Sequence, residues 1–461
     1  MTRPLRVTLI VAPLTLLAAA SFVCGQALRH SVLPGHRLAH LDNRVSSLPE
    51  AGIGGTASDE TLDPDDVAPE DTFKEVLRYV KGDYVDRVDD EKKLGFGAVK
   101  AMLASLDDPR TRFYDPTQRR QLIDQLNGRF SGIGATLTVV KQRKGTGPGA
   151  IEQRRLAVVA PIPGGPAAKA GLQAGDVITE IDGRWVIAYD PRLELDQLTE
   201  DADENDQRTQ TAAKEAVDRL AKGTSLPRAL ELLNSSEGKS LSLTVERTGS
   251  AQPLKVTVGT GATSVEPVEY RALNDHAGYL RVTQFNDRAT EQFTAALAAS
   301  RVSSLVVDLR DNVGGPVTGR QTGALGSALA LVGRLTGPGQ AGVVLRRGNR
   351  MESLSTTVPA AGKYRLSVLV NGGTSNVAEM VAASLKERGG AQVVGSHTFG
   401  DSVYQKLVEL REGAGMTVTT GRLLSARGVD FTGRGVSIDS QTAVGGPAYN
   451  DSAVQRAVGA G

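Results

Sequence analysis

The chain has 461 residues, of which 40% are hydrophobic and 23% charged, so it is long enough to build two or three cores of ordinary domain size. Its 53 Lys and Arg residues nearly balance its 52 Asp and Glu residues, so the chain as a whole has no electrostatic attraction for nucleic acid. With five His, one Cys and no HExxH or CxxC spacing, the sequence predicts no metal site and no other cofactor.

Residues 1–27 have the features of an export signal. Arg3 and Arg6 precede a long apolar run, and Gly25 and Ala27 are small residues at suitable −3 and −1 positions for cleavage. The run is nearly long enough to span a bilayer, so a cleaved signal peptide and an uncleaved membrane anchor both stay open. In either case we expect an exported protein, secreted or anchored at the periplasmic or extracytoplasmic face, with membrane contact only through this segment.

Two segments of different character come next. Residues 28–67 carry many Pro, Gly and Asp residues without a sustained apolar period, which predicts a linker. Over residues 68–128 apolar side chains recur at three- and four-residue spacing, which predicts a helical region whose second helix ends at Pro109. The apolar positions of this pattern are Phe73, Val76, Leu77, Val80, Leu94, Val99, Met102 and Leu103.

Strand and turn patterns replace the helical pattern from residue 129. A Phe-Ser-Gly-Ile-Gly-Ala segment at residues 130–135 leads into alternating strand residues, and a short helix is expected at residues 166–170. A Gly-Asp-Val-Ile strand then ends in the Asp182-Gly183 turn, which favours a hairpin. In this order the motifs resemble a PDZ domain of the circularly permuted kind found inside processing peptidases.

We expect this PDZ domain over residues 129–258, with an insertion at about 190–224. The insertion contains an acidic stretch, Glu200 to Glu204, whose spacing is typical of a solvated loop and lacks the glycine turn of a calcium-binding loop. The sequence therefore predicts no calcium site in this domain.

The resemblance also implies a peptide groove. Successive backbone N–H groups in a loop can receive a terminal carboxylate while the neighbouring strand pairs with an extended peptide. The opposite wall should be a helix over residues 226–233, whose Leu230 and Leu233 face either the ligand or the core. By position, the resemblance assigns the carboxylate-binding loop to Gly132, Ile133, Gly134 and Ala135.

In the last part of the chain, strand patterns at residues 279–282, 303–307 and 366–370 alternate with helical patterns, as α/β architecture requires. With the PDZ motifs, this arrangement resembles the C-terminal processing peptidases over about residues 70–445. The resemblance implies a multidomain α+β protein with an N-terminal helical region, a PDZ domain and an α/β peptidase core of the ClpP/crotonase-like type at residues 259–445. Residues 446–461 would be a C-terminal tail.

In the family, an Asp-Leu-Arg-x-Asn-x-Gly-Gly segment supplies backbone N–H groups to an oxyanion hole. The matching segment here runs from Asp308 to Gly315, with Val313 in place of the usual proline. The resemblance therefore makes Gly314 and Gly315 candidate oxyanion residues, because glycine lets the main chain approach a substrate.

The family's nucleophilic serine stands three residues before a glutamate at the start of a helix. Counting back from Glu379 gives Asn376, whose amide is a very poor acyl acceptor. Asn376 is instead a favoured N-cap residue, and Glu379 stands at the N3 position of a capping box. The sequence thus predicts a retained helix start without the nucleophile.

The family's general base is the lysine of a Thr-Phe-Gly-Lys segment, where burial lets the amine accept the serine proton. Here the segment reads Thr398-Phe399-Gly400-Asp401, while Gln405 matches a glutamine that assists the pair in the family. Both members of the Ser-Lys pair are therefore replaced, and we expect an inactive or severely impaired peptidase site.

Two rearranged sites stay as alternatives. Ser375 could serve as a shifted nucleophile with Lys406 as its base, although a one-residue shift at a helix start turns a side chain by about 100°. Asp401 could act as a base with His397 as its partner.

If catalysis is lost, binding remains. The expected function is that of an extracytoplasmic pseudopeptidase that binds polypeptide C-termini or unfolded tails, as an adaptor or as a regulator of an active paralogue. An active serine-type endopeptidase with a rearranged site and an envelope scaffold with an unused groove are the alternatives.

Overall fold

The computed structural model of the protein describes residues 69–85, 91–108, 110–144, 151–187, 220–235, 238–315, 323–442 and 451–460, with the single residues 211, 214, 217 and 218. The expected export signal, the linker, the acidic stretch of the insertion and Pro109 lie outside the described residues. The chain forms two compact units, Met1–Arg87 and Val88–Gly461, and each is described by itself.

The described part of the first unit is a single amphipathic helix, α2 (Pro69–Asp83). Glu70 and Asp71 lie in its first turn and Lys81 in its last, which complements the helix dipole at both ends. None of its residues is buried, and Phe73 and Val76 expose about half of their surface, 47% and 55%. The expected helical pattern is present here.

The second unit begins with a small helical region. Asp115 caps its last helix by accepting hydrogen bonds from the N–H groups of Thr117 and Gln118, and Gln118 completes a capping box. The ring of Phe96 lies 4.9 Å from that of Phe113, which joins the first helix to the strand between the two helices. These elements are α3 (Glu91–Ala104), β1 (Arg112–Tyr114), α4 (Pro116–Leu126) and β2 (Arg129–Phe130).

A seven-stranded sheet and two short helices form the PDZ domain, with its own core of apolar side chains. The hairpin expected at Asp182-Gly183 is present, and both residues have the positive φ values, 52° and 72°, that a tight Asp-Gly turn requires. The elements are β3 (Ala135–Lys144), β4 (Ile151–Pro161), α5 (Pro166–Lys169), β5 (Val177–Ile181), β6 (Arg184–Ile187), β7 (Thr224–Ser225), α8 (Leu226–Leu233), β8 (Ser240–Glu246) and β9 (Leu254–Gly259).

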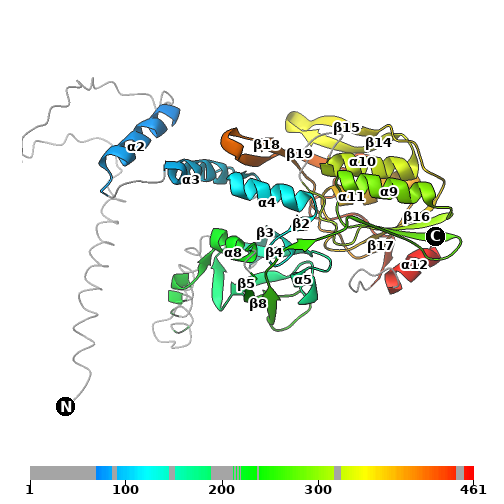
Figure 1. Ribbon diagram of the computed structural model, residues 1–461, viewed down its shortest axis with the longest axis horizontal. Coiled ribbons are helices and arrows are strands. Elements are labelled where there is room, and N and C mark those ends of the chain that lie inside the picture. Colours follow the sequence, from blue (N-terminus) through cyan, green and yellow to red (C-terminus); the bar gives the residue numbers. More distant parts are fainter. Residues whose placement is uncertain are drawn as a thin grey trace, which may run out of the picture. The chain divides into compact units, whose positions relative to one another are not determined.

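The peptidase-like core is built on a six-stranded sheet of order β11-β12-β13-β16-β17-β20, parallel except for the first pair. Figure 1 shows α9, α10 and α11 together beside this sheet. The elements are β10 (Thr263–Ser264, paired with β2), β11 (Val268–Ala272), β12 (Ala277–Val282), α9 (Asp287–Ala299), β13 (Ser304–Asp308), α10 (Gly323–Thr336), β16 (Arg365–Val370), α11 (Val377–Gly389), β17 (Gln392–Gly395) and β20 (Ser440–Gln441).

Helices cover both faces of this sheet. On β13, Leu305 and Val307 pack into the cluster that contains α9, α10 and α11, whereas Val306 packs against α12 (Ser452–Ala460) on the other face. Strand side chains alternate between faces, so the unbroken apolar run of β13 fits a strand that is buried on both sides. The tail expected at residues 446–461 therefore differs from the structure, because α12 is part of the core.

A second sheet completes the core, and its order is β1-β19-β14-β15 with β18 paired to β19. In it β19 lies between β18, the strand that carries Gln405, and β1 of the helical region, because both strands pair with β19. Its remaining elements are β14 (Gly339–Arg346), η2 (Arg347–Asn349), β15 (Arg350–Thr356), β18 (Val403–Glu409), η3 (Arg411–Gly413) and β19 (Gly415–Leu424).

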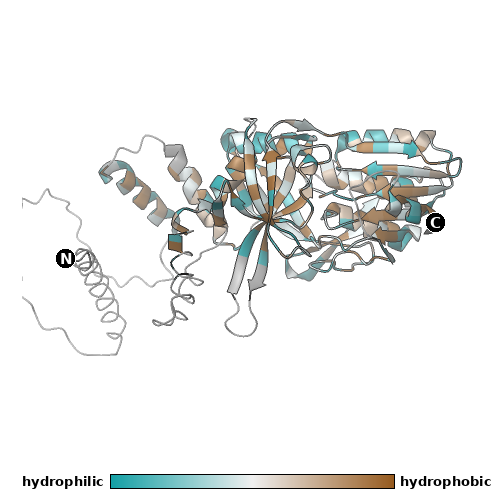
Figure 2. Ribbon diagram, turned by 90° about the horizontal axis from the view of Figure 1, so that it is seen from below, coloured by the Kyte–Doolittle hydropathy of each residue, from teal (hydrophilic) through white to brown (hydrophobic). Residues whose placement is uncertain are grey.

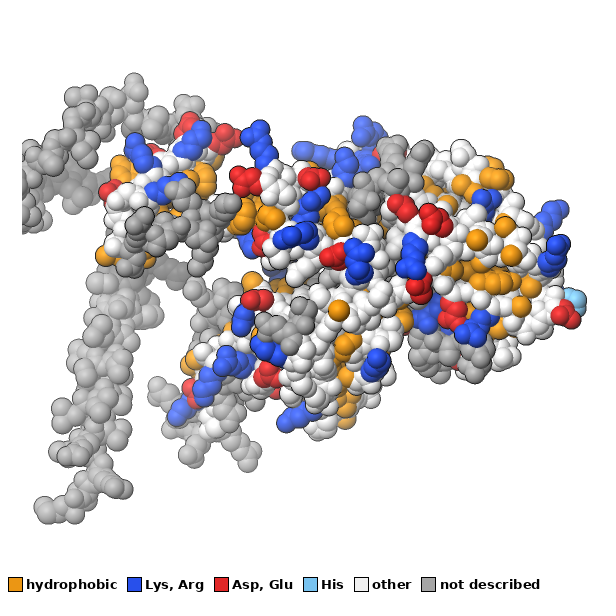
Figure 3. Space-filling model, viewed as in Figure 1, with side chains coloured by type: hydrophobic (Ala, Val, Ile, Leu, Met, Phe, Trp, Pro, Cys, Tyr) orange, Lys and Arg blue, Asp and Glu red, His pale blue; other side chains and the backbone are white. Residues whose placement is uncertain are grey.

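The surface carries both signs of charge. Figure 2 shows hydrophobic residues along the strands of the folded part and hydrophilic residues on its outer helices and loops. Figure 3 shows Lys and Arg side chains interspersed with Asp and Glu side chains over the visible face, in line with the formal net charge of +1. In the described ranges, no helix has both the length and the hydropathy that a bilayer span needs.

Candidate active site

The loop between β16 and α11 turns sharply before the helix begins. Asn371 holds the turn through its side chain: its Oδ1 accepts the N–H groups of Asp311 and Gly373, each at 3.0 Å. Its Nδ2 donates to Asp311 Oδ1 at 2.8 Å. At the end of the loop Asn376 has φ 56° and ψ −119°, a strained backbone that is typical of functional turns.

Asn376 stands at the nucleophile position, and both its side-chain amide and its backbone N–H donate hydrogen bonds. Its Nδ2 donates to the carbonyl oxygen of Val403 at 2.6 Å, and its N–H donates to Glu379 Oε2 at 3.0 Å. The bond to Glu379 agrees with the predicted capping box, and Asn376 is the N-cap of α11. The amide is therefore tied to β18, and no hydroxyl stands at this position.

Glu379 fixes the two loops of the site to each other. Its Oε1 accepts from the Thr398 hydroxyl at 2.6 Å and from the Gly400 N–H at 2.7 Å, while its Oε2 also accepts from the Asp401 N–H at 2.8 Å. Burial raises the pKa of Glu379 to about 7, although the four hydrogen bonds favour the ionised form.

Asp401, at the position of the general base, forms an ion pair with the guanidinium of Arg110. Asp401 Oδ2 contacts Arg110 Nη1, and Oδ1 accepts the N–H of Val403 at 3.1 Å, so both carboxylate oxygens are occupied. A guanidinium has only donors and does not give up its proton in proteins. Neither member of this pair offers the free amine that a Ser-Lys site uses.

The backbone of Arg110 is anchored on the second sheet. Its carbonyl oxygen accepts hydrogen bonds from Gln405 Nε2 at 2.6 Å and from the Thr417 hydroxyl at 2.8 Å. The Thr111 hydroxyl next to it accepts the N–H of Thr419 at 3.1 Å. Gln405, predicted as an assisting residue, thus holds the backbone of the residue that pairs with Asp401.

The glycine loop lies against the helix start. A Cβ added at Gly314 (φ 70°) would lie 2.8 Å from the Val377 nitrogen and 3.1 Å from the Asn376 Cβ, so only glycine fits this approach. The Gly314 N–H donates to Asn312 Oδ1 at 3.0 Å. Gly314 thus lies against the helix start, whereas Gly315 lies near Leu126 and Ala324. The Gly314 donor is occupied by its own loop, and the oxyanion role of both glycines stays a prediction.

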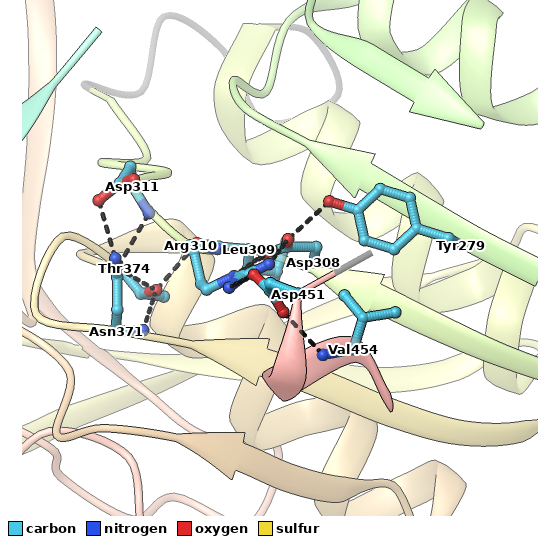
Figure 4. Close-up of polar contacts among 9 residues, drawn as sticks. All are labelled: Tyr279, Asp308, Leu309, Arg310, Asp311, Asn371, Thr374, Asp451 and Val454. Atoms are coloured by element: carbon cyan, nitrogen blue, oxygen red, sulfur yellow. Dashed lines mark hydrogen bonds and ion pairs between the residues drawn. The ribbon is translucent and has the colours of Figure 1, made fainter. Parts of the chain in front are cut away.

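A buried ionic network supports this loop from behind (Figure 4). The fully buried guanidinium of Arg310 binds Asp308, with Nε to Oδ1 at 2.9 Å, and Asp451, with Nη1 to Oδ2 at 2.5 Å. The Tyr279 hydroxyl donates to Asp308 Oδ2 at 2.7 Å. Burial and the neighbouring carboxylate raise the pKa of Tyr279 above its ordinary range, so it remains a donor.

The structure gives little support to the two rearranged sites, and a role for Ser375 stays a prediction. Ser375 lies beside the glycine loop, but among the described residues its hydroxyl has no hydrogen-bond partner. Lys406 is exposed on β18, next in sequence to the inward-facing Gln405, and successive strand residues point to opposite faces. His397 is exposed and bonds the Thr398 carbonyl oxygen at 2.7 Å, while Asp401 pairs with Arg110.

The carboxylate-binding loop of the PDZ domain differs from the prediction at one donor. The N–H of Ile133 donates to the Leu233 carbonyl oxygen, in the last turn of α8, at 2.8 Å. A Cβ at Gly132 would lie 2.1 Å from the same oxygen, so glycine is required there. A ligand carboxylate can use the Ile133 N–H only after this bond opens, and that Gly132, Ile133, Gly134 and Ala135 bind a carboxylate stays a prediction.

The two leucines of α8 have different roles. Leu233 is fully buried in the PDZ core, whereas Leu230, one turn earlier, is partly exposed and lines a cavity together with Leu226. Residues four apart share a helix face, which explains why Leu226 and Leu230 point the same way. Leu233 is thus a core residue, whereas Leu230 packs against the core and also lines the cavity. That Leu230 binds a peptide stays a prediction.

One cavity of about 1120 Å³ joins the PDZ groove to the candidate active site. Its walls include β3, α8, α4 and the glycine loop, and Arg110 and Asp401 also line it. The described residues contain no group of three or more His, Cys, Asp or Glu side chains placed to hold a metal ion.

Arg110 is a residue of the candidate site that no sequence motif indicated. It lies 291 residues from Asp401, and its sequence context, after a proline in a helix-ending turn, carries no signal of an ion pair at that distance. Thr398, which donates to Glu379, had a usable signal in the Thr-Phe-Gly motif.

Comparison with known proteins agrees with this architecture. Residues 276–442 match Peptidase family S41, and residues 158–209 match a PDZ domain. The chloroplastic C-terminal processing peptidase of Tetradesmus obliquus is 30% identical over 376 residues, which cover 80% of this chain and 71% of the relative. The carboxy-terminal-processing protease of Bartonella bacilliformis is 26% identical over 388 residues, which cover 80% of this chain and 75% of the relative.

A solved structure shows the same fold. The photosystem II D1 C-terminal processing protease matches with a TM-score of 0.55 at 25% identity, and the match covers 80% of this chain and 86% of that protein.

Proposed function

The chain belongs to the C-terminal processing peptidases of family S41, and we propose that it is a catalytically inactive member that binds polypeptide C-terminal tails. The observation that carries the proposal is the replacement of the base by the Asp401–Arg110 ion pair, beside an Asn376 amide that is bonded to Val403. Acyl transfer by a Ser-Lys site needs a hydroxyl within reach of a neutral amine. The retained PDZ domain and cavity support binding.

The N-terminal sequence supports the proposal that the chain binds these tails outside the cytoplasm. The basic start and apolar run of residues 1–27 would export the chain, and the folded part would then meet exposed tails in the periplasm or at the extracytoplasmic face. There it would act as an adaptor, or as a regulator that presents or withholds tails from an active paralogue. Mass measurement of the mature N-terminus tests the export step, and a start at Leu28 would show cleavage after Ala27.

Catalysis is tested with the full chain and an unstructured protein that has an apolar C-terminal tail. We expect no cleavage. Turnover that Ser375→Ala abolishes would instead establish an active endopeptidase with a shifted nucleophile and would overturn the proposal.

Binding is tested with one peptide made in two forms, with a free carboxyl end and with an amidated end. Loss of a hydrogen bond to a charged group costs about 1.5–3 kcal/mol, so amidation should weaken binding by roughly 10- to 100-fold. If the chain binds neither form, the groove is unused and the protein is a scaffold.

A further inference from the structure

Helix α4 presents one uncharged face to the cavity. The residues of this face recur at three- and four-residue spacing, so they form a continuous stripe, and none of them carries a charge. The stripe consists of Gln118, Gln121, Leu122, Gln125 and Leu126.

The helix is held firmly on its other sides. Arg119 pairs with Glu409 at 3.0 Å behind the stripe. At the C-terminal end, Gln284 Nε2 donates to the Gln125 carbonyl oxygen at 2.6 Å and Asn286 Nδ2 donates to the Leu126 carbonyl oxygen at 3.2 Å. With the capping box at its start, α4 is fixed at both ends, so the stripe is a rigid wall.

Two amides on this wall are open to a ligand. The side chains of Gln121 and Gln125 make no hydrogen bond to any described residue, although each offers two donors and an acceptor. They lie one turn apart, which is about 6 Å along the helix axis. An extended chain presents backbone groups on the same side every two residues, at about 6.7 Å, so the two spacings match.

The cavity leads from the PDZ groove to this wall. Residues 136–139 of β3 and Leu230 of α8 line this cavity together with Gly314, Gly315 and the stripe of α4. In the described residues β3 pairs with β4 alone, so its second edge can receive an extended peptide by strand addition.

We propose that the stripe of α4 binds the backbone of the polypeptide segment that precedes a captured tail, with Gln121 and Gln125 as its hydrogen-bonding residues. The ligand class is an extended, uncharged polypeptide of any sequence, because amides pair with backbone groups that all residues share. This inference rests on the proposed tail binding, to which it adds a second contact that depends on ligand length.

The test compares two peptides with the same C-terminal residues on the full chain, one of about 5 residues and one of about 15, which spans roughly 50 Å when extended. The longer peptide should bind at least about fivefold more tightly. Gln121→Ala combined with Gln125→Ala should remove most of that gain and leave the short peptide unchanged. Alanine favours helix, so α4 should persist in the variant.

Arg120→Ala is the matched control, because Arg120 is exposed on the same helix outside the cavity lining, and it should keep the gain. Equal affinity for both peptides, or a gain that survives the double substitution, would overturn the α4 proposal alone. If only the long peptide binds and the double variant loses it, α4 binds peptide without the PDZ groove and tail capture fails. Binding of neither peptide rejects both proposals.

Discussion

At the position of the family's basic amine, this chain has an ion pair whose members lie 291 residues apart, Arg110 and Asp401. A lysine introduced alone at residue 401 would face the Arg110 guanidinium, and two cations at contact distance repel each other. The surrounding glycine loop and the Glu379 hydrogen bonds are in place. Restoring a fully active Ser-Lys pair therefore requires changes at three side chains, those of Asn376, Asp401 and Arg110.

We predict that Asn376→Ser alone yields no cleavage, that turnover needs both Asn376→Ser and Asp401→Lys, and that adding Arg110→Thr to these two makes it fastest. Turnover is measured as cleavage of an unstructured protein that has an apolar C-terminal tail. The double variant that keeps Arg110 should be at least about tenfold slower, because the guanidinium holds the new lysine away. A triple variant with Asp401→Met, similar in size to lysine but without the amine, is the control, and activity in it would contradict the assignment.

A second prediction concerns pH. The pKa of Glu379 is raised to about 7 from an ordinary value of 4.5, so between these values the folded chain binds a proton more tightly than the unfolded chain. Stability should therefore fall as pH rises through this window, by up to ~3 kcal/mol. Denaturant midpoints at pH 5 and pH 8, followed by circular dichroism, measure the slope.

Glu379→Gln removes this titration and should flatten the slope. Burial also raises the pKa of Asp311, so the comparison of the two chains isolates Glu379. An unchanged slope in the variant would show that Glu379 is not the titrating group.

At residue scale, motifs located the positions but did not identify their partners. The spacing from Glu379 found Asn376, and the Thr-Phe-Gly segment found Asp401, because both motifs are local. The pairing of Arg110 with Asp401 could not be predicted from the sequence, because only the fold brings the two residues together. The Ile133 N–H also looked free, since nothing in the sequence shows that the Leu233 carbonyl oxygen would take it.

At the scale of elements, the helix over residues 226–233 was predicted with its observed bounds, but α12 was missed. Ala453, Val454 and Ala457 are small or short side chains at the end of the chain, with too little apolar character to indicate a packed helix. Their partners are alternate residues of buried strands, and an apolar run on a strand does not reveal what covers its second face.

Asp451 ties α12 to the core, and Asp451→Ala should destabilise the folded chain by about 3 kcal/mol. The substitution removes an acceptor for the Val454 N–H, at 2.9 Å, and one of the two carboxylates that bind the buried Arg310. Denaturant unfolding measures the change. Gln455→Ala, at an exposed position of the same helix, should stay within about 0.5 kcal/mol, and an equal loss in both variants would contradict the role of Asp451.

At the scale of the molecule, the PDZ domain and the peptidase-like core have separate apolar clusters that share no residue. We therefore predict that they unfold in separate transitions. The chain's single tryptophan, Trp185, lies on β6 and reports on the PDZ domain alone. The sequence showed this organisation because each part has its own motifs and its own apolar pattern.

Leu243→Ala in the PDZ core should lower the midpoint of the Trp185 fluorescence transition, at a cost of about 2–5 kcal/mol, because Leu243 is fully buried. The circular dichroism signal of the remaining core should be unaffected. Leu297 is buried in α9 of the peptidase-like core. Leu297→Ala should therefore lower the midpoint of the circular dichroism transition of that core and leave the Trp185 fluorescence transition unchanged. A common shift of both signals in either variant would mean that the two parts unfold as one.

In the unliganded protein the Leu233 carbonyl oxygen accepts the Ile133 N–H, so it competes with a ligand carboxylate for this donor. A tail that uses the Ile133 N–H has to meet a molecule in which this bond is broken. Its measured affinity is then the intrinsic affinity scaled by the fraction of molecules with the bond open, and an open fraction of roughly 1 in 100 would weaken binding about 100-fold. Scarce tails would then leave the groove shut, and only a local surplus of chain ends would fill it.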